Sequence, residues 1–276
     1  MPQIFAGSDR YPDETGGVVV AAAIIGPVAA TERRRAQAVS FGAAAATYER
    51  ARPSYPDEAI GWLLPPGARR VLDLGAGTGK LTRALRDLGL DVVAVEPSAG
   101  MREQLARVLP GVTVLAGTAE QIPLAGQAVD AVLVAQAWHW VDPARAVPEV
   151  ARVLTPGGRL GLLWNIRDER ADWVAELTRI IHTPDYTDNG STAPVVGPPF
   201  GPVERLDVEW SRLTGPDAIV DLVASRSYII TMPPDERAAV LSRVRHLLGT
   251  HPGLAGAAEI SLPYVTRCSR AQLAPS

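Results

Sequence analysis

The feature that most constrains the fold is a regular alternation of short apolar runs and helical patterns that begins near Arg69. The apolar runs end in turn residues and cover 70–74, 91–95, 112–116, 129–135 and 159–164. Short runs that are apolar throughout are typical of strands buried on both faces. Strands that alternate with helices predict an α/β fold with a parallel, doubly wound sheet and right-handed crossovers.

The C-terminal part of the chain has a different pattern. Residues 203–213 and 258–267 alternate as strands do, and helical stretches cover 171–182, 216–225 and 234–249. We therefore expect a Rossmann-like, mostly parallel sheet of seven strands with helices on both faces. The helices between the last two strands are expected to form a lid inserted in the C-terminal part.

Charge and composition narrow the class of partner. The chain has 276 residues, a net charge of -3 and a pI near 5.9, so nothing favours nucleic acid, which selects a basic face. The apolar run 16–30 is shorter than the roughly 20 residues that span a bilayer, and we expect no stable membrane insertion. Residues 1–36 are expected to be a poorly ordered extension, and 37–276 a single domain.

Cysteine and histidine usage argues against disulfides and metal. Cys268 is the only cysteine, so an internal disulfide or a paired-cysteine metal site is excluded. The histidines are scattered at His139, His182, His246 and His251, and we expect no bound metal. A cytoplasmic enzyme, monomeric or homodimeric, fits these features.

The first apolar run opens the stretch VLDLGAGTGKLT, residues 71–82. A nucleoside-triphosphate loop requires G-x-x-x-x-G-K-[ST], but Leu74 and Leu81 occupy the positions of its first glycine and its hydroxyl residue. That reading is excluded. Lys80, the only lysine, is expected in the first turn of the next helix without a required ligand contact.

The glycines of this stretch still favour a nucleoside ligand. Gly75, Gly77 and Gly79 follow a strand and precede a helix, although the dinucleotide fingerprint G-x-G-x-x-G has one more residue before its last glycine. Glu96 ends the next apolar run, where a carboxylate can accept both hydroxyl protons of a ribose. An NAD-dependent oxidoreductase remains an alternative at this point.

Asp73 lies two positions before the first glycine, and the string D-L-G-A-G-T-G resembles the first motif of the class I S-adenosylmethionine-dependent methyltransferases, [DE]-x-G-x-G-x-G. The resemblance implies that S-adenosyl-L-methionine is the cofactor and a methyl group is transferred. It places Asp73, Gly75, Ala76, Gly77 and Gly79 around the methionine part of the donor. Residues 37–165 are then the donor-binding core, and 166–276 carry the acceptor-side lid and the last two strands.

Later motifs occur in the order of that family. Residues 117–124 resemble its adenine-binding segment, although Thr118 stands where an acid is usual, and residues 135–140 resemble its fourth motif. Residues 151–158 match the helix and turn before its fifth strand. The further donor-binding residues implied are Glu96, Pro97, Met101, Thr118, Ala119, Glu120 and Gln136.

Residues 41–56 are similar to the N-terminal segment of the methyltransferase type 11 group, which includes the trans-aconitate methyltransferase branch. The similarity is strongest to uncharacterised methyltransferases of GC-rich bacteria. It implies that this segment folds over the donor. Tyr48 and Arg52 are then candidates to bind the donor carboxylate.

Fewer residues are candidates for contact with the methyl acceptor. His139 is a candidate general base for a hydroxyl or an acidic carbon, or else a histidine packed between two tryptophans. Trp138 and Trp140 are candidates to wall a small-molecule acceptor or to pack the end of the sheet. Arg226 can grip an acceptor carboxylate, with Tyr228 beside it. A non-catalytic S-adenosylmethionine-binding protein is the second alternative.

Overall fold

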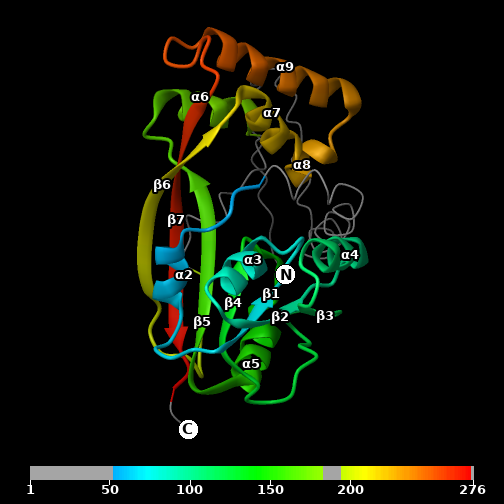
Figure 1. Ribbon diagram of the computed structural model, residues 1–276, viewed down its shortest axis with the longest axis vertical. Coiled ribbons are helices and arrows are strands. Elements are labelled where there is room, and N and C mark those ends of the chain that lie inside the picture. The colour runs from blue at the N-terminus through cyan, green and yellow to red at the C-terminus, as the bar shows by residue number, and fades with distance from the viewer. Residues whose placement is uncertain (1–51, 183–193, 275–276) are drawn as a thin grey trace, which may run out of the picture.

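The computed structural model describes residues 52–182 and 194–274, and its strands form one seven-stranded sheet. The strands are β1 (Arg70–Leu74), β2 (Asp91–Val95), β3 (Thr113–Leu115), β4 (Val129–Ala135), β5 (Leu154–Arg167), β6 (Glu204–Thr214) and β7 (Ile260–Gln272). Their order is β3-β2-β1-β4-β5-β7-β6, with β7 antiparallel to both of its neighbours. The predicted Rossmann-like, mostly parallel sheet is therefore confirmed (Figure 1).

Helices complete the layers. They are α2 (Asp57–Leu63), α3 (Lys80–Asp87), α4 (Ala99–Val108), α5 (Pro143–Val153), α6 (Asp172–Ile181), α7 (Pro216–Ala224), α8 (Ser227–Ile230) and α9 (Pro234–Thr250), with a 3-10 turn η1 (Trp138–Trp140). Alternate residues of β1 and β4 face opposite layers, as the pleat requires. Val71 and Leu133 pack with α2 and α3, whereas Leu72 and Val132 pack with α5.

A second core lies at one end of the sheet. Helices α6, α7 and α9 pack on one another and on the first residues of β7 through buried side chains such as Val174, Val223, Val244 and Leu262. In Figure 1 these helices gather at the end toward which the arrowhead of β5 points. Of these helices, α7 and α9 lie between β6 and β7, where the sequence predicts the helical lid, whereas α6 precedes β6 and packs against them. Within the described residues, no helix has both the length and the apolar character needed to cross a membrane.

The structure corrects several expected boundaries. β5 runs from Leu154 to Arg167 and β7 reaches Gln272. The two strands pair continuously from Arg159↔Gln272 to Arg167↔Tyr264. This pairing satisfies the hydrogen-bonding groups of the backbone even where the side chains are polar. A proline inside a helix usually interrupts it, but α5 begins at Pro143 and contains Pro148.

The starts of α4 and α5 look alike in sequence but differ in structure. Asp142 precedes the first-turn Pro143, and its carboxylate accepts a hydrogen bond of 3.0 Å from the Ala144 N–H. Ser98 occupies the equivalent position before α4, but its side chain makes no capping hydrogen bond. Only the cap of α5 therefore stabilises its helix through the side chain.

This difference predicts the effect of two matched substitutions. Asp142→Ala leaves the Ala144 N–H without its partner and should lower the free energy of unfolding by about 1 kcal/mol. Ser98→Ala should lower it by much less. Urea unfolding followed by circular dichroism measures both values, and equal losses would contradict the assignment of the caps.

Candidate functional site

The predicted donor-binding residues meet at the carboxyl ends of β1, β2 and β4. β1 pairs with β2 on one side and β4 on the other, and the chain order of the strands reverses at this point, where ligands bind in open α/β sheets. The N–H groups of Gly75 and Ala76 donate to the Val95 carbonyl at 2.8 and 3.1 Å. The glycine loop is thereby held against the end of β2.

The glycine loop is shaped by close packing at its two ends and is open in the middle. Gly75, Gly77 and Gly79 have φ values of 74°, 56° and 95°, which glycine adopts without a steric penalty. A Cβ atom at Gly75 would lie 3.0 Å from that of Ala137, and one at Gly79 would lie 3.0 Å from Leu105. Among the described residues, a Cβ atom at Gly77 would meet nothing within 4 Å, so the backbone here is open to a ligand.

Glu96 connects the loop to the start of α4. One carboxylate oxygen accepts from the Gly77 N–H at 2.9 Å and the other from the Ser98 N–H at 2.8 Å. Burial raises its pKa, against these two hydrogen bonds and the nearby Arg102. Each oxygen keeps a further lone pair, so the carboxylate can still accept hydrogen bonds from a ligand. Pro97 follows on the surface and Met101 is buried.

Asp73 is fully buried beneath the loop. Its Oδ2 atom accepts a 2.5 Å hydrogen bond from the Thr82 hydroxyl, and its Oδ1 atom has no hydrogen-bond partner among the described residues. Burial raises its pKa to about 7, with a smaller contribution from Glu96. Thr82 was not singled out from the sequence, although it belongs to the stretch 71–82. It lies in the first turn of α3, two residues after Lys80.

The turn after β3 holds the predicted adenine segment. Thr118 is exposed and forms an isolated antiparallel β-bridge with Gln121. Ala119 is buried in the main core. The Glu120 carboxylate accepts from the Asp142 N–H at 2.9 Å. Glu120 thus ties this turn to the start of α5, and that contact gives it a structural role beside any ligand contact.

The segment after β4 carries Gln136 in a left-handed conformation, with φ of 58°. Its N–H donates to the Leu163 carbonyl at 2.9 Å, and its side-chain amide donates to the Asn165 carbonyl at 3.2 Å. Gln136 is therefore fixed from both backbone and side chain by β5. Such a conformation is strained for a non-glycine residue and is common at functional sites.

The aromatic residues that follow differ in burial. Trp138 is 4% exposed and packs in the main core, where its contacts favour the packing alternative. His139 and Trp140 are half-buried, and their ring centroids lie 4.5 Å apart. These two residues remain accessible candidates for contact with an acceptor.

The remaining candidates come from the segment before α2 and from the junction of α7 and α8. Arg52 is half-buried in the segment before α2, whereas Tyr48 lies outside the described residues. Arg226 lies at the junction of α7 and α8, with its guanidinium carbon 5.9 Å from the centre of the Tyr228 ring.

A chain of hydrogen bonds that the sequence did not reveal connects the segment before α2 with Gln136 and with β6 and β7. The Trp210 indole N–H donates to the Thr266 hydroxyl at 2.8 Å, this hydroxyl donates to Asn165 Oδ1 at 2.6 Å, and the Asn165 amide donates to the Ser54 carbonyl at 2.9 Å. Asn165 also accepts from Gln136. β6, β7, β5, β4 and the segment that carries Arg52 are thereby joined by hydrogen bonds. Residues more than a hundred positions apart meet here, which no local pattern indicates.

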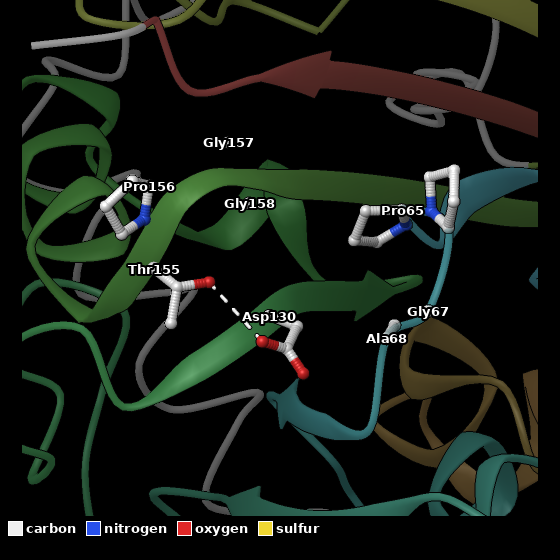
Figure 2. Close-up of a pocket in the computed structure, with 9 residues that line it drawn as sticks. Pro65, Gly67, Ala68, Asp130, Thr155, Pro156, Gly157 and Gly158 are labelled. Carbon is white, nitrogen blue, oxygen red and sulfur yellow. Dashed lines mark hydrogen bonds between the residues drawn. The ribbon is translucent and has the colours of Figure 1, made fainter.

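A hollow of about 160 Å³ lies at the opposite end of the sheet, among Pro65, Pro66, Gly67, Ala68, Asp130, Thr155, Pro156, Gly157 and Gly158 (Figure 2). The Asp130 carboxylate there accepts from the Arg69 and Arg70 N–H groups at 2.8 and 3.0 Å. The hydrogen bonds of Asp130 are therefore structural. The hollow itself lies at the amino ends of the strands. Among the described residues, no group of three or more His, Cys, Asp or Glu side chains is placed to hold a metal ion.

Comparison with known proteins agrees with this geometry. The family model described as a methyltransferase domain matches residues 72–162, from β1 to β5. A solved structure assigned as a type II methyltransferase of Anaeromyxobacter dehalogenans has a TM-score of 0.63 at 24% identity, covering 82% of this chain and 99% of its own. This similarity supports the fold.

Relatives extend the similarity over most of the chain. An uncharacterized methyltransferase of Mycobacterium tuberculosis is 60% identical over 242 residues, which are 87% of this chain and 98% of the relative. A methyltransferase-like protein of Schizosaccharomyces pombe is 31% identical over 86% of this chain and 96% of its own length. Together with the glycine loop and the strand order, these matches show that the chain belongs to the class I S-adenosylmethionine-dependent methyltransferases.

Proposed function

We propose that this methyltransferase binds its donor along the carboxyl ends of β1, β2 and β4 and methylates a small-molecule acceptor at a carboxylate or hydroxyl oxygen. The observation that supports the donor position is the hydrogen bond from the Gly77 N–H to Glu96, at a glycine where an added Cβ atom would meet no neighbour among the described residues. S-adenosylmethionine, when bound, supplies a methyl group on a sulfonium, whose leaving group is neutral.

The residues present fit that donor. The Glu96 carboxylate has lone pairs left for the two ribose hydroxyls, and the bare backbone at Gly77 allows close approach. Asp73 Oδ1 is a buried acceptor without a protein partner among the described residues, and it suits the ammonium of a methionine part. Thr118 and Ala119 provide backbone groups for an adenine ring, with Gln136 at the facing strand end.

The acceptor side needs alignment and exclusion of water more than it needs chemical activation. His139 and Trp140 follow β4, the strand next to the glycine loop, and are half-buried. His139 accepts the proton of a hydroxyl acceptor as the new bond to carbon forms. A carboxylate acceptor carries no such proton, and His139 then acts only by packing.

The first prediction concerns the ribose contact. Glu96→Gln removes a charged hydrogen-bond acceptor and should weaken binding of S-adenosylhomocysteine about tenfold or more. Isothermal titration calorimetry measures this, with Glu103→Gln on the exposed side of α4 and Lys80→Arg as controls that should change the affinity less than about twofold. Equal affinity of the Glu96 variant and wild type would contradict the donor position, as would binding of NAD in place of S-adenosylhomocysteine.

The second prediction concerns the buried acid. The pKa of Asp73 is about 7 in the folded chain and ordinarily 3.8, so between these values the folded state holds a proton that the unfolded state has released. The free energy of unfolding therefore falls as the pH rises through this range. Asp73→Asn removes the dependence and should stabilise the ligand-free protein at pH 8 by at most about 4 kcal/mol, with little gain at pH 4.

Urea unfolding at the two pH values tests this, with exposed Asp87→Asn as the control of matched charge change. The same Asp73 variant should bind S-adenosylhomocysteine more weakly at pH 8, because a neutral amide replaces the partner of the ammonium. If the variant is no more stable than wild type at pH 8, ionisation of the buried Asp73 carboxylate does not destabilise the fold and the prediction is wrong.

The third prediction separates the two roles of His139. If the acceptor is a hydroxyl, His139→Ala should lower kcat by about 100-fold or more and leave the affinity for S-adenosylhomocysteine unchanged. The rate is measured by release of S-adenosylhomocysteine in the presence of an acceptor found by screening. His139→Phe preserves the ring contact with Trp140 and serves as the packing control. Unchanged turnover in both variants would exclude a general base at this position.

A further inference from the structure

A buried tyrosine on β7 has an unused hydroxyl. Tyr264 is 3% exposed, and its hydroxyl group has no hydrogen-bond partner among the described residues. Its ring stacks on Trp210, with centroids 4.9 Å apart and planes inclined by 19°. Because a buried hydroxyl normally has a partner, this one is suited to hydrogen-bond a bound ligand.

Two arginines flank Tyr264 on the same face of the sheet. Arg167 is its direct partner on β5, and Trp210 is its partner on β6. Arg212 follows Trp210 by two residues and therefore faces the same side. Arg167 is 7% exposed and donates to the Thr178 hydroxyl of α6 at 3.2 Å, so its guanidinium group is held by the lid.

Two more arginines approach from outside the sheet. The charges of Arg167, Arg226, Arg52 and Arg212 all act on the Tyr264 hydroxyl, and each of them favours its ionised form. We call these four residues the arginine cluster. Burial has the larger effect and raises the pKa of Tyr264, so the hydroxyl keeps its proton and can donate a hydrogen bond.

The arginine cluster is connected to the donor side of the sheet. Asn165 precedes Arg167 by two residues on β5, accepts a hydrogen bond from Gln136 at the end of β4, and donates one to the Ser54 carbonyl. Ser54 in turn follows Arg52 by two residues. The same short network therefore connects a donor-side residue to positions two residues from Arg167 and from Arg52. A small molecule held by the cluster then lies on the carboxyl side of β4 and β5.

We propose that Tyr264 and the arginine cluster form the recognition site for an anionic group, a carboxylate or a phosphate, on the methyl acceptor. Tyr264 donates its O–H to one oxygen of the anion, and the planar guanidinium of Arg167 donates in parallel to two oxygens. Arg226 closes the site from the junction of α7 and α8. This assignment rests on the proposed methylation of a small molecule and restricts the substrate to an organic acid or a phosphate ester.

The test uses the full chain and two readouts. Citrate and inorganic phosphate are titrated by calorimetry at constant ionic strength, into protein already saturated with S-adenosylhomocysteine. Release of S-adenosylhomocysteine from S-adenosylmethionine is then compared for small carboxylic acids, their primary amides, and phosphate esters. The variants are Tyr264→Phe and Arg167→Gln, with Arg205→Gln as the control, because Arg205 is an exposed arginine on the opposite face of β6.

We expect citrate or phosphate to bind wild type, and Tyr264→Phe to weaken that binding about tenfold while S-adenosylhomocysteine affinity stays within twofold. Acids or phosphate esters should be methylated and the amides should not, with KM rising in Tyr264→Phe more than kcat falls. Preference for acids identifies a carboxylate, and preference for esters identifies a phosphate. Arg205→Gln should match wild type.

The inference is overturned if S-adenosylhomocysteine binds normally but neither anion does, or if Tyr264→Phe binds the anion as wild type does. It is also overturned if amides and acids are methylated equally. Failure of wild type to bind S-adenosylhomocysteine would instead overturn the proposed donor site. Tyr264→Phe removes a single oxygen atom, so it tests the inference even if Arg167→Gln does not fold.

Discussion

The carboxylate of Glu96 is the contact on which the donor side of the structure depends. It is 7% exposed at the end of β2 and accepts hydrogen bonds from the loop after β1 and from the start of α4. Burying a carboxylate is costly unless hydrogen bonds compensate, and these two backbone N–H groups supply them. The same carboxylate therefore shapes the glycine loop in the free protein and keeps lone pairs for a nucleoside.

On the proposed acceptor side, Asn165 connects several elements much as Glu96 does on the donor side. It belongs to β5, yet its three hydrogen bonds reach the end of β4, the hydroxyl of Thr266 on β7 and the segment before α2. β7 and the lid helices share the second core, so the position of the lid is connected to the donor edge through one amide. The proposed acceptor site and the donor edge are thus joined by the same hydrogen bonds.

Much of the fold was predictable from local pattern. The apolar runs that became β1, β2 and β4 coincide with the observed strands, since a strand buried on both faces must be apolar throughout. The ends of β5 and β7 were not predictable, because Arg167 and Arg270 are held in the sheet by antiparallel pairing that polar side chains do not reveal. The short helices α2 and α8 also escaped, since a single turn or two carries too little periodicity.

The sequence by itself determined the class of the protein, because the spacing of Asp73, Gly75, Gly77 and Gly79 and the position of Glu96 one strand later can be counted along the chain. Only the tertiary structure decided that Trp138 packs in the core, that Thr82 bonds to Asp73, and that Tyr264 lies beside Arg167. The physical reason is that the donor motifs lie in contiguous loops, whereas the side chains of the proposed acceptor site come from strands and helices that meet only when the whole sheet has assembled.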